Sequence, residues 1–181
     1  MIKTVVLVIA VLLVVAVGAV LAYAATKPDT FRVQRSAGIK ASPTTIVPFL
    51  TDFRAYRSWS PYEQMDPDMK RTYSGAASGK GAVYEWDSAG KAGAGRMEIA
   101  DATPARVGLM LDFARPFEAH NKVDFILEPK GEVTEVTWAM HGGVPYMAKV
   151  MHVLFDMDRM VGKDFETGLA NLKTLAEAQS R

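Results

Sequence analysis

The residues that could carry out chemistry or bind a metal are few in this chain. It contains three histidines and no cysteine, so disulfides and cysteine-ligated metals are excluded. His152 and Asp156 lie four residues apart, which on a helix would place two possible metal ligands one turn from each other. Because no third ligand follows at a defined spacing, an ordinary pair of neighbouring side chains is the preferred interpretation. We expect no metal and no cofactor.

The other polar groups have simple structural interpretations. The glycine-rich segment 75–81 departs from a phosphate-binding loop in its spacing and in its final residue, so we predict a turn between strands. Asp66 and Asp68 flank a proline, and a solvated loop is preferred over a calcium site. His120 and His141 are expected at the surface. No Ser/His/Asp arrangement is found, so we predict no catalytic residue and leave open whether the chain is an enzyme.

Two polar residues are predicted to face an apolar interior. Asn121, Val123 and Phe125 are every second residue of one predicted strand, so their side chains lie on the same, buried face. A buried amide needs hydrogen-bond partners. A loop backbone is the preferred partner, and orientation of a ligand is the alternative. Arg35 is inward by the same alternation, and extension of its guanidinium to the edge of the domain is preferred over contact with a ligand.

Aromatic and methionine side chains are the main candidates for lining a cavity. Methionine adapts to varied apolar shapes, and tryptophan and tyrosine add a polar tip that can orient a bound molecule. Each of these residues could equally belong to the core. With the Asn121 amide included, the candidate binding residues are Trp59, Tyr84, Trp86, Phe113, Asn121, Trp138, Met140, Met151 and Met157.

The elements that must position these residues follow from the apolar periodicity. Strands are indicated where apolar residues alternate with polar ones. Ser42 and Pro43 begin a short helix as N-cap and first helical residue, and a second short helix covers 52–59, before a polar loop over 62–69. The predicted strands cover residues 31–40, 71–74, 80–87, 96–103, 105–113, 117–128 and 133–141.

The end of the chain has helical periodicity. Apolar residues recur close to every 3.6 positions from Met151 to Ala178, and charged residues occupy the opposite side. We therefore predict one long amphipathic helix over 151–178. Its apolar side needs a cover, and the strands before it predict that this cover is an antiparallel sheet with one buried face.

The N-terminus predicts a membrane anchor. The segment from Thr4 to Ala25 has no charged residue, and about 22 helical residues span a hydrocarbon core of about 30 Å. The alternative is a cleaved signal peptide, because residues 22–24 fit an A-x-A pattern, but the apolar run exceeds the usual length of about 7–15 residues. We predict a single-pass anchor over residues 1–26. Basic residues lie on both sides of the segment, so the side of the membrane stays open.

The remainder is the size of one domain. Residues 27–30 are a short linker, and residues 31–181 are predicted to form the domain. Lys3 and Lys27 account for two of the 21 basic residues, which leaves 19 against 20 acidic residues. This balance gives no basic surface of the kind that binds nucleic acid, so DNA and RNA are not expected partners.

One strand, two short helices, a run of strands and a long C-terminal helix follow each other in the order of the helix-grip fold. Over about residues 31–178 the sequence resembles the START-like (SRPBCC) superfamily, and most of all bacterial members of its polyketide cyclase/dehydrase and lipid-transport family. The stretches that carry the resemblance are FRVQRSAGIKASPTTIVPFLTDFRAYRSWSPYEQMDP, YSGAASGKGAVYEW, LEPKGEVTEVTWAM and GLANLKTLAE.

The resemblance implies an α+β fold of the START/Bet v 1-like type, in which a curved antiparallel sheet and the C-terminal helix enclose an apolar cavity. The expected function is a membrane-anchored domain that binds a hydrophobic small molecule or a lipid in that cavity. Two alternatives stay open, because members of one fold differ in function. One is an enzyme like the polyketide cyclases and aromatases, and the other is a protein-interaction module like the chaperone activators of the superfamily.

Overall fold

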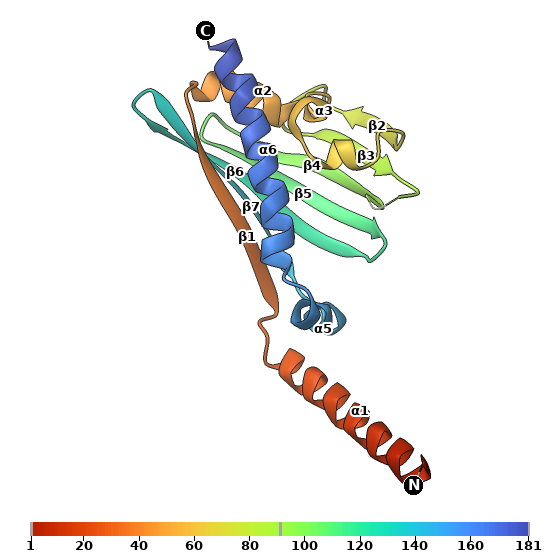
Figure 1. Cartoon of the computed structure of the whole chain (residues 1–181). Helices are drawn as coiled ribbons and strands as arrows, with labels where there is room; N and C mark the ends of the chain where they lie inside the picture. The colour runs from red at the N-terminus through yellow and green to blue at the C-terminus, as the bar shows by residue number, and fades with distance from the viewer. Residues whose placement is uncertain (1, 91, 181) are drawn as a thin grey trace.

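The computed structural model of the chain describes residues 2–90 and 92–180, apart from the side chains of residues 152 and 154. A curved sheet is crossed on one face by a long helix, and an apolar helix, α1 (Ile2–Ala25), extends away from the domain (Figure 1). The strands are β1 (Thr30–Ile39), β2 (Lys70–Gly75), β3 (Ala82–Asp87), β4 (Ala94–Ala102), β5 (Arg106–Arg115), β6 (Ala119–Lys130) and β7 (Val133–Gly143).

All strands belong to one seven-stranded sheet in the order β1-β7-β6-β5-β4-β3-β2. Every neighbouring pair is antiparallel, because consecutive strands are joined by turns and β1 closes the other side against β7. Irregularities in the β4–β5 register between Ala94 and Gly95 and between Ile99 and Asp101 add local twist. The predicted strands are confirmed, with ends that shift by a few residues.

Three short helices lie between β1 and β2. The first, α2 (Pro43–Thr51), begins as predicted, because the Ser42 hydroxyl accepts a hydrogen bond from the Thr45 amide at 3.3 Å. The second, α3 (Tyr56–Trp59), is shorter than the predicted 52–59. The prediction of a loop over 62–69 is wrong in its first part, where one helical turn forms α4 (Tyr62–Met65). This turn buries Glu63.

The prediction of one helix over 151–178 is also wrong. The chain forms α5 (Tyr146–Leu154) and then α6 (Met157–Gln179). Between them Asp156 has an extended backbone and caps α6, since its Oδ1 accepts a hydrogen bond from the Arg159 amide at 3.0 Å. Residues 152 and 156 therefore belong to different elements, and the predicted pairing of His152 with Asp156 involves a side chain outside the described part of the chain.

The core lies where α6 crosses the sheet. The Phe165 ring of α6 stacks on the Trp138 indole of β7, with centroids 4.1 Å apart and an interplanar angle of 8°. Trp59 of α3 meets Trp138 edge to face at 5.4 Å. A Cβ atom on Gly168 would lie 2.6 Å from Trp138 Cζ3, so glycine allows α6 to approach the sheet this closely.

The contacts of α1 with the domain are made through α5. The Tyr146 hydroxyl donates a hydrogen bond to the Leu21 carbonyl at 2.8 Å. Ala24 is fully buried, and Lys149 of α5 pairs with Asp29 in the connection to β1 at 2.5 Å. In length and composition α1 qualifies as a membrane-spanning helix.

Candidate functional site

The concave face of the sheet is covered unevenly. α6 packs along β1 and β7, and α2 packs against α6 and one end of β5 and β6 (Figure 1). At the other end, near α5, the inward-facing side chains are only half-buried. We call five of these residues the rim: Phe31, Met97, Phe113, Ala119 and Gly142. They come from β1, β4, β5, β6 and β7, and strand register places them in two adjacent rows.

Asn121 lies just inside the rim, between Leu111 of β5 and Gly142 of β7. It is 5% exposed, as the alternation of its strand predicts. Its Oδ1 lies directly over Gly142, where an added Cβ atom would be only 2.2 Å away. Within the described part of the chain the Asn121 side chain makes no hydrogen bond, either to the loop backbone that we expected or to another group.

A second inward polar group is also unpaired. The Trp138 Nε1–H is buried and has no hydrogen-bond partner among the described residues. More than about nine in ten buried polar groups in proteins have a partner, so an unpaired one requires an explanation. The concave face thus carries an amide and an indole N–H whose hydrogen-bonding capacity is unused.

The expected cavity under the centre of α6 is occupied by side chains. Trp59 is fully buried, and its Nε1 donates to the Phe49 carbonyl at 3.0 Å. Trp138 and Phe165 fill the adjoining space through the stack described above. At this point the candidates Trp59 and Trp138 serve the core, and the accessible part of the concave face is displaced toward the rim.

The other predicted binding residues are distributed over several regions. Phe113 of the rim packs edge to face against Trp86 at 5.7 Å, and Trp86 Nε1 donates to the Ala92 carbonyl at 3.0 Å. Met140 is buried, and it pairs across β6 and β7 with Val123, which lies two residues after Asn121. Two methionines lie apart from this group: Met151 is 43% exposed on α5 and Met157 is half-buried at the start of α6.

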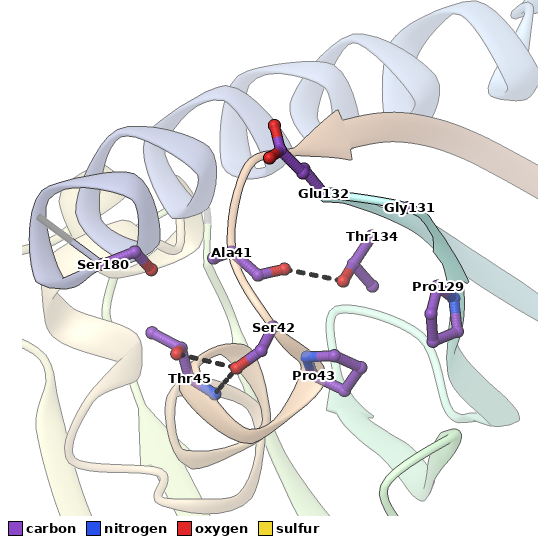
Figure 2. Close-up of a pocket in the computed structure, with 9 residues that line it drawn as sticks. All are labelled: Ala41, Ser42, Pro43, Thr45, Pro129, Gly131, Glu132, Thr134 and Ser180. Atoms are coloured by element: carbon purple, nitrogen blue, oxygen red, sulfur yellow. Dashed lines mark hydrogen bonds between the residues drawn. The ribbon is translucent and has the colours of Figure 1, made fainter.

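Two surface hollows are found away from the rim. One, of about 410 Å³, lies at the far end of α6, where the β1–α2 connection meets the β6–β7 turn (Figure 2). Figure 2 shows that two of its polar side chains already have partners: Thr134 donates to the Ala41 carbonyl at 2.7 Å and Ser42 caps α2. The other, of about 190 Å³, lies beside Phe53 and Tyr73. Neither contains a predicted site residue.

Sequence reasoning missed a buried carboxylate. Glu63 of α4 is 7% exposed. Its Oε1 accepts a hydrogen bond from the Tyr84 hydroxyl at 2.5 Å, and its Oε2 accepts one from Arg71 Nε at 2.7 Å. Burial, followed by the hydrogen bond to Glu63, raises the pKa of Tyr84 above its ordinary value. Both carboxylate oxygens are therefore occupied, and the candidate Tyr84 is part of this structural group.

Arg35 joins β1 to α6. Its Nη2 lies 2.9 Å from Asp158 Oδ2, and its Nε lies 2.8 Å from Glu166 Oε1. The hydrogen bond from Arg35 lowers the pKa of Asp158. Arg35 thus extends to a solvent-exposed part of α6, where the side chains of Asp158 and Glu166 are each 61% exposed.

The aspartate loop and the glycine-rich segment form the loop and the turn that the sequence predicts. Asp66 accepts a hydrogen bond from the Ser88 hydroxyl at 2.5 Å, so it orders its own loop. The glycine segment 75–81 forms the β2–β3 turn, with positive φ at Gly75, Gly79 and Gly81. No cluster of three or more possible metal ligands occurs within residues 2–90 and 92–180.

His120 is expected to titrate above the ordinary pKa of about 6.5. Its side chain is 69% exposed on the outer face. A hydrogen bond to Asp112, with Nδ1 and Oδ1 2.7 Å apart, raises its pKa. Because the folded-state pKa is raised, the contribution of His120 to stability is complete below the ordinary pKa and is lost as pH rises through the raised one. An NMR titration should show this shift, and Asp112→Asn should remove most of it; an unchanged pKa would contradict it.

The comparisons with known proteins agree on the fold. Protein CV1439 from Chromobacterium violaceum has a TM-score of 0.56 and 15% identity, over 83% of this chain and 99% of that one. The Aha1 dimer from Colwellia psychrerythraea has a TM-score of 0.55 and 20% identity, over 81% and 96%. The di-domain ARO/CYC StfQ from the steffimycin biosynthetic pathway has a TM-score of 0.61 and 9% identity, over 83% and 52%.

At these identities the likeness shows the helix-grip fold alone. A search of curated proteins finds no match. The sequence model of the family described as polyketide cyclase / dehydrase and lipid transport matches residues 30–177, which includes every strand and most of α6. The chain therefore belongs to the polyketide cyclase / dehydrase and lipid transport family.

Proposed function

We propose that this protein is a membrane-anchored START-like domain that binds a hydrophobic small molecule or a lipid on the concave face of its sheet, at the rim. The proposal rests chiefly on Asn121, which is buried among apolar residues and has no hydrogen-bond partner in the described chain. An amide that keeps so little contact with water and has no protein partner is destabilising, up to about 1–3 kcal/mol if it is fully removed from water. A bound molecule with one carbonyl, ester or hydroxyl group would supply that partner.

The composition of the rim fits such a ligand. Ligand sites are mostly apolar and contain a few convergent polar groups that fix orientation. Phe31, Met97 and Phe113 offer apolar, half-buried surface, and Asn121 offers both a donor and an acceptor. Gly142 leaves room for the amide, since any larger residue there would displace its oxygen.

The contacts between α1 and the domain support an anchor rather than a cleaved signal peptide. Cleavage after Ala24 would remove the acceptor of the Tyr146 hydrogen bond and the helix turn that buries Ala24. In our proposal residues 1–26 are the anchor, 27–30 the linker and 31–181 the binding domain. The intact mass of the chain isolated from membranes tests this directly, because loss of the first 24 residues would refute the anchor.

The enzyme alternative gains no support from the buried carboxylate. A general acid or base must come within hydrogen-bond reach of a substrate. Both oxygens of Glu63 are engaged by Tyr84 and Arg71, so the carboxylate orders α4 and β2 instead of facing the rim.

Asn121→Leu is expected to separate binding from stability. Replacement of this unpaired amide by an apolar side chain of similar size should leave the free energy of unfolding unchanged or raise it by up to about 1 kcal/mol. The same change should weaken binding of a fluorescent fatty acid or phospholipid about tenfold, which corresponds to about 1.4 kcal/mol. Denaturant titration and a binding titration on the full chain in amphipol measure the two effects.

Gly142→Ala provides a second perturbation of the same amide. Its Cβ atom would displace Asn121 Oδ1, whereas the neighbouring Gly143→Ala meets nothing within 4 Å and serves as the matched control. We expect Gly142→Ala to weaken binding and Gly143→Ala to leave it unchanged. If Asn121→Leu destabilises the fold and does not alter binding, the amide has a structural role and the proposal fails.

A further inference from the structure

We propose that α5, the beginning of α6 and the β5–β6 turn lie in the surface of the lipid bilayer beside α1, so that the rim opens at the membrane. This proposal depends on the anchor proposed above. It adds a second membrane contact, made by the folded domain itself, and it identifies the bilayer surface as the partner of an apolar face that the domain leaves exposed.

The depth of α5 follows from its contact with α1. Tyr146 donates its hydroxyl hydrogen to the carbonyl of Leu21, at a distance of 2.8 Å. Leu21 lies four residues before the end of α1 at Ala25, which is about 6 Å along the helix at 1.5 Å per residue. The Tyr146 hydroxyl therefore lies level with the last turns of the spanning segment, and α5 packs against α1 near this level. A helix in this position cannot be separated from the bilayer by a layer of water.

The side chains exposed at this end of the domain are those that a membrane surface binds. Outside α1, large apolar side chains that are exposed in the described chain are concentrated on α5, on the α5–α6 connection, at the start of α6 and on the β5–β6 turn. These are Phe117 (75%), Tyr146 (45%), Met147 (70%), Met151 (43%), Phe155 (50%) and Met160 (57%), and Met65 is the one such residue elsewhere. Apolar faces of this kind rest about 5–10 Å deep in the boundary between headgroups and acyl chains.

Phe117 lies at the same end of the sheet, although it is distant in sequence from α5. The pairing of Phe113 with Ala119 ends the β5–β6 hairpin, and the pairing of Thr30 with Gly143 ends β1 and β7 on the same side. Figure 1 shows the β5–β6 turn directed toward the side of the molecule that holds α5 and α1. The exposed phenyl ring therefore provides a second point of contact beside α5.

The end of α1 has the composition of a membrane interface. Tyr23 is 53% exposed, and the Lys27 ammonium lies 4.5 Å from the centroid of its ring. Tyrosine is enriched at the level of the lipid headgroups, and lysine side chains extend toward them. The level at which α1 leaves the hydrocarbon is thus marked by Tyr23 and Lys27, and α5 packs at this same level.

The consequence concerns the route of a ligand. The rim residues Phe31, Ala119 and Gly142 lie at the end of the sheet that this arrangement places against lipid. A lipid could then move from the bilayer to Asn121 over apolar side chains, and its acyl chain would not need to cross water. The transfer cost of about 0.8 kcal/mol per exposed CH₂ group would be avoided.

The test uses the absence of native cysteine. Single cysteines at Met151, Phe117, Leu12 and Glu132 of the full chain are labelled with an environment-sensitive fluorophore. The chain is placed in vesicles of phosphatidylcholine and phosphatidylglycerol that contain quenchers at the headgroup or deep in the acyl chain. We expect Met151→Cys and Phe117→Cys to be quenched from the headgroup, Leu12→Cys from the acyl chain, and Glu132→Cys, at the opposite end of the domain, from neither.

The outcomes separate the two proposals. If Leu12→Cys is quenched but either Met151→Cys or Phe117→Cys behaves like Glu132→Cys, the surface contact is refuted and the anchor stands. If Leu12→Cys is not quenched, the anchor itself fails. As a further check, Met147→Asp with Phe155→Asp should reduce quenching at Phe117→Cys, whereas Met65→Asp, at a methionine that is 46% exposed away from this face, should not. Equal quenching in both variants would also refute the contact.

Discussion

Phe165→Ala is expected to destabilise the fold by about 3–5 kcal/mol, the range for loss of a buried aromatic side chain. Phe165 is 1% exposed and stacks on Trp138 at 4.1 Å, so it connects α6 to the centre of the sheet. Its removal leaves a cavity between two rigid elements that cannot collapse fully. Denaturant titration of the full chain in detergent, followed by circular dichroism, measures the change.

The matched control for this prediction is on the same helix. Thr167 is exposed on α6 and its hydroxyl bonds only to the Lys163 carbonyl of its own turn, at 3.0 Å. Thr167→Ala should change the free energy of unfolding by no more than about 0.5 kcal/mol. A Phe165→Ala effect as small as this would mean that α6 is not held on the sheet through the aromatic stack, and the account of the core would be wrong.

Arg71→Met is expected to cost about 3–5 kcal/mol, because it leaves the buried Glu63 carboxylate without its cation. The pair is deeply placed, with side-chain exposures of 11% and 5% for Arg71 and Glu63. Arg71 also donates to the carbonyls of Pro67 and Met69, at 3.0 and 2.8 Å, so it orders the connection between α4 and β2. Thermal and denaturant unfolding should both show the loss.

Two further variants identify the cause. Glu63→Gln together with Arg71→Met removes both charges and still leaves a carbonyl for the Tyr84 hydroxyl, so it should recover part of the lost stability. Arg115→Met breaks an ion pair with Asp87 whose side chains are 55% and 63% exposed, and it should cost no more than about 1 kcal/mol. If Arg115→Met and Arg71→Met cost the same, burial is not what makes the Glu63 pair important.

Local periodicity was sufficient to predict the sheet. Each strand alternates apolar and polar residues, so the inward position of Asn121 could be predicted without knowledge of its neighbours. The helix order and the resemblance then predicted the curved sheet and the C-terminal helix. Alternation cannot predict that the space under α6 is filled. The filling depends on contacts between Trp59, Trp138 and Phe165, which come from three different elements.

The features that were not predicted depend on a local cap or on contacts between residues that are distant in the sequence. The apolar period continues across residue 155, so α5 and α6 were predicted as one helix, although Asp156 is a normal N-cap residue. Glu63 lies in a polar segment that resembles a loop, and its burial depends on Arg71 and Tyr84, which are 8 and 21 residues away. No single-sequence pattern connects Arg35 with Asp158 over 123 residues.

The connection between α1 and β1 has a consequence for how such a protein would move cargo. It is only a few residues long, and Asp29 within it is paired with Lys149 at 2.5 Å. In a membrane-anchored chain this pairing would restrict rotation of the domain about its stalk, and the domain could not diffuse to another organelle or envelope layer as a soluble carrier does. Cargo would have to be handed over in place, to an acceptor that comes within about one domain diameter of the same membrane.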